Sequence, residues 1–275
     1  MAQITATEVN KLRKTTGAGM MDCKKALQEA DGNFGKAIEI IRKKGQAVAN
    51  KRADREASEG VVLAKYNADK TLGAMIVLNC ETDFVAKNED FIGFAKQILD
   101  SAIKNNSADL ESLKQAKLEG KSISEKILEQ VGIIGEKIEL AFFDKISAAQ
   151  VVAYIHPGNK LATLVGFNKT TSEQVAKDVA MQVAAMNPVA VDKDNVPEEI
   201  IKKEKEIGRE QARREGRPEN ILDKIAEGKL NKFFKESTLL NQEFTKDNKK
   251  TIRQYLQEND KELTVTTFLR YSLND

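Results

Sequence analysis

The chain has 275 residues, enough for two or three domains with a sizeable hydrophobic core. Its 44 lysines and arginines nearly balance its 42 acidic residues, so the formal charge of +2 gives no bulk attraction toward nucleic acid or anionic membranes. Tryptophan is absent and aromatic residues make up 5% of the chain, which argues against a surface on which bases stack and favours a helix-rich protein.

The cysteines and the apolar runs predict a cytoplasmic protein. Cys23 and Cys80 lie in different predicted modules without metal-ligand partners nearby, so we expect two reduced, partly buried thiols. The first five residues do not form a charged segment followed by an apolar one, as a leader peptide would. No apolar run approaches the ~20 residues that a membrane span requires. We therefore expect a protein that stays inside the cell and contacts no membrane.

Residues 1–45 predict a module of three short helices. Thr5 and Glu8 have the spacing of a capping box in front of the first helix. Asn33 is expected to cap the third helix and Gly45 to end it. A bundle this small is only marginally stable alone, so we expect it to act as a docking module.

The segment at residues 16–19, with the sequence Thr-Gly-Ala-Gly, resembles a phosphate-binding loop only superficially. It follows no predicted strand, and it lacks the later glycine and the Lys-Ser/Thr pair of such loops. We favour a tight turn between two helices. Beyond the module, residues 46–60 are strongly charged and predict a solvated linker that is compatible with a helix.

Residues 61–144 predict the first subdomain of a core. Strands at residues 61–66 and 71–80 flank a hairpin turn, and alternating apolar residues from Leu72 to Leu78 predict one buried face of the second strand. The other predicted elements are a helix that starts near Phe91, weaker helices at residues 110–118 and 124–131, and a third strand whose inward residues are Ile138, Leu140 and Phe142.

Residues 80–88 connect the second strand to the following helix and are expected at the surface, because buried loops leave backbone polar groups unpaired. They place the phenyl ring of Phe84 beside the carboxylates of Glu81 and Asp83, where a partner could contact all three. The alternative is a loop whose Phe84 folds back onto its own core, and composition leaves both open. The two carboxylates supply too few oxygen ligands to fill the coordination shell of a cation.

The second half of the chain repeats the pattern of the first. Leu72 aligns with Leu161 and Asn79 with Asn168, each pair 89 positions apart, which indicates a duplicated unit. The helices that follow align 81 positions apart, so the first copy holds eight additional residues, and these fall within residues 80–88. An addition that the second copy lacks points to recognition rather than to packing.

The second subdomain is interrupted by an insertion. Its first part, residues 145–187, predicts two strands around a turn that contains His156, and then a helix from Ser172 with Met186 among its inward residues. Its second part, residues 235–275, predicts a closing helix and strand. Together the two subdomains predict an α+β fold with two three-stranded antiparallel sheets and helices on one face of each.

The insertion at residues 188–234 predicts an antiparallel helical hairpin. Pro197 and Pro218 each stand where a helix begins. The first helix contains six acidic and six basic residues, which favours surface ion pairs over a stripe that follows phosphates. Ile200 and Ile207 offer only a narrow apolar contact line, so we expect the hairpin to project and to be free to contact another subunit.

An apolar pair, Ile133 and Ile134, stands between two glycines and has two interpretations. The pair either packs under the first sheet, which we favour, or forms a second exposed contact. The pair directly precedes the predicted third strand of the first subdomain.

The search for catalytic motifs favours a protein that is not an enzyme. The single histidine, His156, precedes a proline in a predicted turn, and the nearest serine, Ser147, lies at the far end of a predicted strand. No HExxH, CxxC or P-loop motif occurs in the sequence. The pattern therefore points to binding rather than to covalent chemistry.

Two motifs resemble those of a known family. The sequences TGAGMMDCKKAL at residues 16–27 and NCETDFVAK at residues 79–87 are similar to the two characteristic motifs of bacterial translation elongation factor Ts, and the similarity extends over nearly all of the chain. Two motifs in the right order and spacing are more specific than either one. The resemblance implies a module of three helices like the ubiquitin-associated (UBA) domain, a duplicated core and a coiled-coil hairpin, in the order found above.

The resemblance also implies a function. Members of that family are guanine nucleotide exchange factors for elongation factor Tu, from which they release GDP so that GTP can bind. Asp83 and Phe84 would insert between helices of the partner's GTPase domain and disturb its Mg²⁺ site and phosphate-binding elements. The partner-binding residues implied by the resemblance are Thr82, Asp83, Phe84, Val85, Lys24, Ile134, Gly135 and His156. No cofactor, protein-bound metal, direct nucleic-acid contact or membrane is implied, and the hairpin would mediate self-association, as a homodimer or 2:2 complex, or contact the partner.

The chain departs from the family pattern at its end. After Tyr271 only four residues follow, where many relatives continue into a C-terminal helical module that also binds the partner; this departure would affect affinity more than exchange. The rival interpretation is a ribosome- or RNA-binding accessory protein, which predicts RNA binding that weakens steeply with salt. A purely structural dimer predicts neither RNA binding nor a GTPase complex that GDP dissociates.

Overall fold

The computed structural model describes residues 4–275; the first three residues, which entered the predictions of a leader-free start and of the module at residues 1–45, lie outside the described part. Three helices come first: α1 (Ala6–Thr16), α2 (Met20–Glu29) and α3 (Phe34–Arg52). Thr5 and Glu8 form the predicted capping box, and Asn33 caps α3 as predicted. Leu12, Cys23 and Leu27 are among the residues of a small core that the three helices share.

Gly45 does not end α3, contrary to the prediction, because the helix continues to Arg52 and includes much of the predicted linker. Gly45 is buried where α3 crosses α7 (Ile123–Ile134). A Cβ atom at Gly45 would lie 3.3 Å from the carbonyl oxygen of Leu128 and 3.6 Å from Cα of Gly132. The glycine therefore permits a close helix crossing, and this crossing joins the three-helix module to the rest of the chain.

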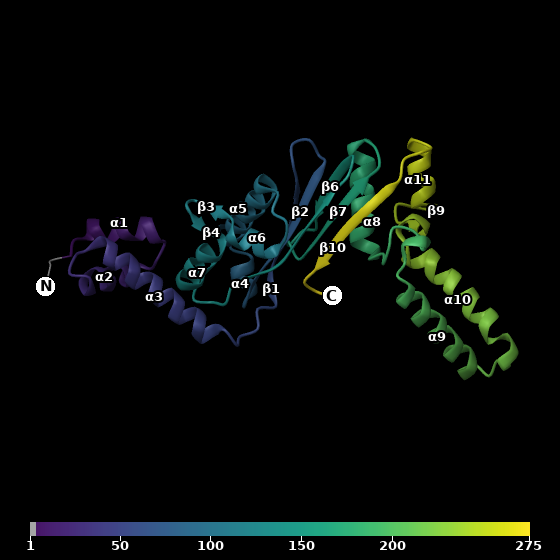
Figure 1. The fold of residues 1–275 in the computed structure, drawn as a ribbon, viewed down its shortest axis with the longest axis horizontal. Coiled ribbons are helices and arrows are strands. Elements are labelled where there is room, and N and C mark those ends of the chain that lie inside the picture. The colour runs from purple at the N-terminus through teal and green to yellow at the C-terminus, as the bar shows by residue number, and fades with distance from the viewer. Residues whose placement is uncertain (1–3) are drawn as a thin grey trace.

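Two three-stranded antiparallel sheets form the centre of the molecule, as predicted (Figure 1). The first has the order β1-β2-β5 and the second the order β10-β7-β6. Their strands are β1 (Glu59–Tyr66), β2 (Leu72–Cys80), β5 (Glu139–Ser147), β6 (Gln150–Ile155), β7 (Leu161–Phe167) and β10 (Val265–Ser272). The central strands, β2 and β7, are the two that the internal comparison aligned, so both sheets have one topology.

The two sheets pack face to face, which buries both faces of β2 rather than the single face that was predicted. Ile76 and Leu78 belong to the helix-covered core of the first sheet, whereas Met75 and Val77 pack against the second sheet. The sheets approach closely at Gly73, where a Cβ atom would lie 2.6 Å from Cγ1 of Val151. The run from Ala74 to Leu78 is apolar without interruption, which is the pattern of a strand buried on both faces, whereas the prediction used only every second residue.

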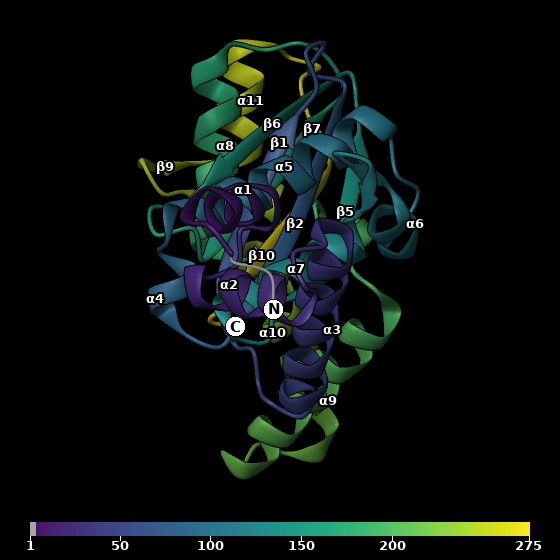
Figure 2. The same ribbon diagram turned by 90° about the vertical axis from the view of Figure 1, so that its left-hand side faces the viewer.

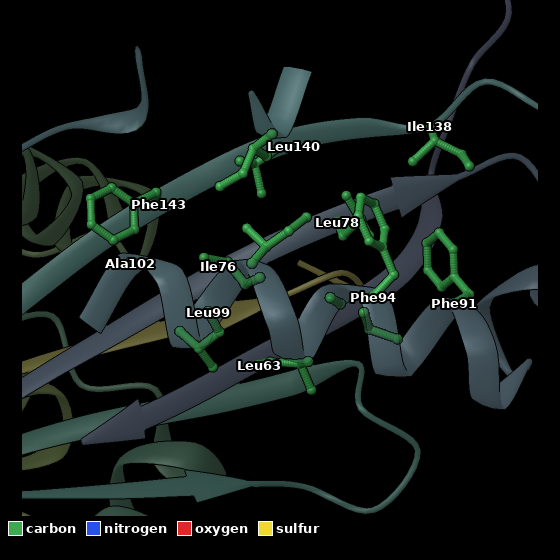
Figure 3. Close-up of a cluster of buried hydrophobic side chains, with 14 of the residues drawn as sticks. Leu63, Ile76, Leu78, Phe91, Phe94, Leu99, Ala102, Ile138, Leu140 and Phe143 are labelled. Atoms are coloured by element: carbon green, nitrogen blue, oxygen red, sulfur yellow. The ribbon is translucent and has the colours of Figure 1, made fainter. Parts of the chain in front are cut away.

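Helices cover the outer face of each sheet (Figures 1 and 2). The first sheet is covered by α4 (Asp83–Ala86), α5 (Glu89–Asn105), α6 (Leu110–Gln115) and α7, and the second by α8 (Glu173–Met186) and α11 (Ile252–Asn259). Figure 3 shows Phe91, Phe94 and Leu99 of α5 beside Ile76 and Leu78 of β2. Met186, predicted to face inward, is 43% exposed because it is the last residue of α8.

Short elements complete the chain. The helix predicted over residues 110–118 ends at Gln115, and its last two positions form a strand instead. The remaining elements are β3 (Lys117–Leu118), β4 (Lys121–Ser122), β8 (Glu243–Phe244), β9 (Asp247–Thr251) and the 3-10 turns η1 (Lys193–Asn195), η2 (Glu219–Ile221) and η3 (Leu239–Asn241).

A β-bulge in β5 changes which of its residues face the first core. Val77 pairs with Phe142 but Leu78 pairs with Leu140, so one residue of β5 is unpaired between them. Leu140 and Phe143 consequently face the helices, and Phe142 packs between the sheets. The prediction that Phe142 alternates with Leu140 on one face is wrong for this reason.

The insertion forms a hairpin of α9 (Glu198–Arg214) and α10 (Leu222–Ser237), and it extends away from the sheets in Figures 1 and 2. Small residues of α9 meet two leucines and an alanine of α10, namely Leu222, Ala226 and Leu230, rather than forming the predicted isoleucine line. Gly208 and Ala212 are buried against α10, where Ala226 is also buried, while Ile207 is 36% exposed. No helix within residues 4–275 is both long enough and apolar enough to cross a membrane.

Candidate functional site

The connection between β2 and α5 contains a one-turn helix, α4, that holds Phe84 outward. Thr82 caps this helix, since its side-chain oxygen accepts a hydrogen bond from the backbone N–H of Val85 at 3.4 Å. Val85 and Ala86 pack against the first core, whereas the Phe84 side chain is 83% exposed, the highest exposure among the large apolar residues described. The alternative in which Phe84 folds back is therefore excluded. We call residues 82–87 the Phe84 turn.

Asp83 lies in solvent beside the ring and remains ionised. The ammonium group of Lys87 donates a hydrogen bond to its carboxylate at 2.6 Å, one helical turn away. This bond, assisted by the more distant charge of Lys160, holds the pKa of Asp83 below its usual value. The turn therefore presents a phenyl ring next to a negative charge that is already paired within the chain.

Glu81 turns inward and is not available to a partner, contrary to the prediction for this loop. Its side chain is only 14% exposed. One carboxylate oxygen accepts a hydrogen bond from the guanidinium group of Arg52 at 2.7 Å, and the other accepts one from the backbone N–H of Lys137 at 2.6 Å. Residues 4–275 contain no group of three or more side chains that could hold a metal ion.

Glu136 bonds directly to the turn, and sequence analysis did not single it out. Its carboxylate accepts hydrogen bonds from the backbone N–H groups of Glu81 and Thr82, both at 3.1 Å, and from the hydroxyl group of Thr82 at 2.7 Å. The only hint in the sequence was its position directly after Gly135, between the predicted helix at residues 124–131 and the predicted third strand. Nothing in its local pattern distinguished it from the other glutamates of the chain.

Ile134 and Gly135 lie at the end of α7, immediately before Glu136, and are thereby brought close to the Phe84 turn. Gly135 ends the helix with a left-handed backbone, at φ 82°. Ile134 packs against the first core, as favoured for the apolar pair. Its neighbour Ile133 is 38% exposed and lies against the three-helix module, where its Cδ1 atom would be 2.8 Å from a Cβ atom at Gly17. Ile134 therefore has the favoured role, whereas Ile133 is partly exposed but packs on the module, which neither alternative described.

His156 is exposed in the turn between β6 and β7, at the same end of the core as the Phe84 turn. Its Nδ1 atom is 3.0 Å from the hydroxyl oxygen of Tyr154. Lys160 in the same turn forms a 2.9 Å ion pair with Glu59, the first residue of β1, which pairs with Cys80 at the end of β2. Figure 1 shows α4, the start of β1 and the C-terminal end of β10 at this common end.

Lys24 is the outlier among the predicted residues. It is an exposed residue of α2 in the three-helix module, and in Figure 1 α7 lies between α2 and α4. The Phe84 turn, Gly135 and His156 thus share one end of the core, while Lys24 belongs to the three-helix module, which has a small core of its own.

Comparison with known proteins identifies the family. The model of the family described as Elongation factor TS matches residues 81–275, more than half of the chain. The Elongation factor Ts of Christiangramia forsetii is 53% identical over 275 residues, which cover 99% of this chain and 100% of that protein. Those of Porphyromonas gingivalis (53% identical over 273 residues, 98% of each chain) and Amoebophilus asiaticus (54% over 270 residues, 97% of this chain and 98% of that protein) are similarly close. The chain belongs to the elongation factor Ts family.

Membership of the elongation factor Ts family confirms the resemblance inferred from the two motifs. The family match begins at Glu81 and so includes the whole Phe84 turn, Gly135 and His156, whereas Lys24 lies outside it. The relatives in the comparison extend the similarity to the three-helix module, since their alignments cover nearly the entire chain.

Two groups that could act as nucleophiles, the thiol of Cys80 and the hydroxyl group of Ser147, have surroundings that differ from each other. Burial, assisted by the negative charge of Glu136, raises the pKa of the Cys80 thiol to about 12, so the thiol is neutral at physiological pH. Ser147 pairs with Leu72 at the opposite end of the sheets from His156. The Phe84 turn itself presents an exposed ring, a carboxylate paired with Lys87 and a backbone bonded to Glu136.

Proposed function

We propose that this protein is a guanine nucleotide exchange factor for elongation factor Tu and that it accelerates GDP release without covalent catalysis. Membership of the elongation factor Ts family supports the partner and the reaction. The character of the site supports the absence of covalent chemistry, because an exchange factor requires only a surface that binds the nucleotide-free partner more tightly than the GDP-bound one. We place this activity in the cytoplasm.

The observation on which the mechanism rests is the exposed ring of Phe84. In our proposal the Phe84 turn enters between helices of the partner's GTPase domain, where the ring fills a pocket that exists only when the Mg²⁺ site is distorted. A buried aromatic anchor can contribute ~2 kcal/mol or more to an interface. By linkage, the factor by which the ring lowers the affinity for GDP equals the factor by which GDP lowers the affinity for this protein.

Asp83 acts in this proposal by its negative charge beside the ring. Close to the phosphate groups of the bound nucleotide, a carboxylate repels their negative charge. Close to the Mg²⁺ ligands, it competes with those ligands for the metal ion. Its bond to Lys87 helps to hold the turn before binding, and this pair is easily broken because solvent screens exposed ion pairs. Thr82 and Val85 support the turn from either side.

The remaining contacts form a wider surface. Ile134, Gly135 and His156 lie at the same end of the core as Phe84 and would contact the same partner, and Lys24 would contact it from the three-helix module, which we infer to be UBA-like. The hairpin of α9 and α10 is proposed to be a short antiparallel coiled coil that mediates self-association, as a homodimer or a 2:2 complex. Two exposed apolar residues on the hairpin, Ile207 and Ile221, support that role.

The decisive experiment replaces Phe84 by alanine and follows the release of a fluorescent GDP analogue from elongation factor Tu. We expect release at least about tenfold slower than with the wild-type protein, in line with the loss of an aromatic anchor, and an unchanged thermal transition, because the ring is 83% exposed. Val189→Ala removes a different exposed apolar side chain, 43% exposed at the base of the hairpin, and should leave release unchanged.

A pull-down of elongation factor Tu with and without GDP separates this function from its rivals. An exchange factor forms a complex that GDP dissociates. If the wild-type protein left GDP release unaffected and instead bound RNA with a steep salt dependence, the ribosome- or RNA-binding alternative would replace this proposal.

A further inference from the structure

At the base of the Phe84 turn, two carboxylates accept hydrogen bonds from backbone N–H groups of each other's segment. Glu136 accepts the backbone N–H groups of Glu81 and Thr82, and Glu81 in return accepts the backbone N–H of Lys137. Each side chain thus bonds to the backbone of the segment that bears the other. We call Glu81 and Glu136 the carboxylate pair.

We propose that Glu136 is the positioning residue of the exchange surface: it fixes the Phe84 turn relative to the end of α7 before the partner arrives. The inference deepens the proposed function and rests on it. Glu136 does not need to contact the partner. It acts through Thr82, the N-cap of α4, and therefore sets the direction in which Phe84, two residues later, leaves the core.

The bonds of Glu136 meet a specific need of the backbone at this point. β2 ends at Cys80 and α4 begins at Asp83, so the N–H groups of Glu81 and Thr82 belong to neither a strand ladder nor a helix. Donors left without partners in a half-buried position are costly, and bonds to an ionised carboxylate are stronger than bonds to neutral acceptors. One side chain satisfies both N–H groups and the Thr82 hydroxyl group.

Pre-organisation is the physical benefit. A turn that was disordered in the free protein would have to be ordered on binding, and that cost would reduce the free energy available to displace GDP. α4 has only four residues, which is too short to be stable by itself. The carboxylate pair supplies the missing support from outside the helix.

The same cluster reaches the end of α3. Arg52, the last residue of that helix, bonds to Glu81, and the ammonium group of Lys137 donates to the backbone carbonyl groups of Ala53 and Arg55 at 3.0 and 3.1 Å. The base of the Phe84 turn, the start of β5 and the end of α3 are thus connected through one set of polar contacts. The Phe84 turn is therefore held both by the segment that precedes β5 and by the end of α3.

The kinetic test compares three variants in exchange assays over a range of concentrations of the GDP complex of elongation factor Tu. For Glu136→Ala we expect kcat to fall about tenfold with KM nearly unchanged, because the other contacts still dock the partner and only the insertion of the ring is impaired. Glu136→Gln should recover most of kcat: its amide oxygen can accept both N–H groups, and its NH₂ group can donate to the Thr82 hydroxyl group. Glu139→Ala removes a glutamate of β5 that is 52% exposed and lies 3.8 Å from the ammonium group of Lys137. Lys137 keeps its bonds to Ala53 and Arg55 in this variant, which should therefore match the wild type.

A structural test runs beside the kinetic one. The amide protons of Glu81 and Thr82 should exchange with solvent at least about tenfold faster in Glu136→Ala than in the wild type, Glu136→Gln or Glu139→Ala, since their acceptor is lost. Should Glu136→Ala fail to fold, Glu136→Asp replaces it: the charge is kept, but the side chain is one carbon shorter and cannot bond to both residues. The same losses are then expected.

The outcomes separate the inference from the proposed function. Normal kcat and normal amide protection in a folded Glu136→Ala variant would overturn the positioning role while leaving exchange intact. A wild-type protein without exchange activity would remove the proposed function, and the amide exchange of Glu81 and Thr82 would still decide whether Glu136 fixes the turn. Equal loss in Glu136→Ala and Glu139→Ala would point to a general charge effect and would also contradict the inference.

Discussion

Phe84 and Phe91 lie seven positions apart and have opposite surroundings. The side chain of Phe91 is 2% exposed within the core of the first sheet, whereas that of Phe84 is 83% exposed. Burial of a phenylalanine stabilises a fold by ~1.5–3 kcal/mol relative to leaving it in water, so Phe84 forgoes a contribution of that size. A large ring in that position adds little to the free energy of unfolding, which is consistent with the binding role proposed for it.

The thiol of Cys80 provides a prediction about pH. Burial raises its pKa to about 12 in the folded protein, while an unfolded thiol has a pKa of about 8.5. Above that lower value the unfolded chain loses a proton that the folded chain keeps, so the free energy of unfolding falls as the pH rises, by at most ~1.4 kcal/mol per pH unit. The contribution is fully present below pH ~8.5.

Urea unfolding of the wild type and of Cys80→Ala between pH 8 and pH 10 checks this prediction. The wild type should lose stability more steeply with pH than the variant, in which that thiol is missing. Identical slopes would mean that the thiol is not desolvated in solution. Below pH 8 the stability difference between the two proteins should be constant.

Helix packing in the hairpin depends on one glycine. A Cβ atom at Gly208 of α9 would lie 3.2 Å from Cα of Ala226 in α10, a backbone atom that cannot move aside. We expect Gly208→Leu to separate the two helices and to lower the helical signal or the melting temperature of the hairpin. Gly228→Leu is the matched control in α10, because a Cβ atom there meets no atom within 4 Å.

The hairpin prediction is measured by circular dichroism together with sedimentation. If the hairpin mediates self-association as proposed, Gly208→Leu also shifts the protein toward the monomer, whereas Gly228→Leu does not. A Gly208→Leu variant with wild-type melting would show that the helices separate without cost, contrary to the packing argument.

At the scale of elements, local pattern predicted most helices and strands, and it failed where a distant segment decided the outcome. Gly45 resembles a helix end, yet it lies inside α3 because α7 crosses there. Phe142 was placed on the wrong face because a bulge in β5 is defined only by its pairing with β2. The internal repeat located the Phe84 turn, whereas Glu136, 54 positions after Thr82, could not be assigned to it before the fold was known.

At the scale of the whole molecule, the N-terminal module contacts the rest of the chain where α3 crosses α7 at close range. A Cβ atom at Gly132 would lie 2.9 Å from Cα of Gly45, and a largely apolar cavity of about 250 Å³, lined partly by Ile38 and Leu128, lies alongside. We expect Gly132→Val to push the helices apart and release the module. Small-angle scattering should then report a larger radius of gyration and proteolysis should increase near Arg52.

Gly93→Val is the control for this prediction. It also introduces a branched side chain into a helix, α5, but a Cβ atom at that position meets no atom within 4 Å. Its scattering curve should match the wild type. A compact Gly132→Val protein with wild-type proteolysis would mean that the crossing tolerates the extra volume and that other contacts hold the module.

The duplicated sheets run in opposite senses, and this has a consequence for how the molecule is approached. β2 ends beside the start of β1, near Lys160 at the start of β7, so the connection that follows β7 lies at the far end, where Lys169 pairs with Asp260. A perfect duplicate would have two interchangeable poles, and a partner could dock in either of two orientations. The additional helical turn, α4, lies at one pole only, so the two poles differ in shape, and a partner that docks on Phe84 as proposed would meet only one of them.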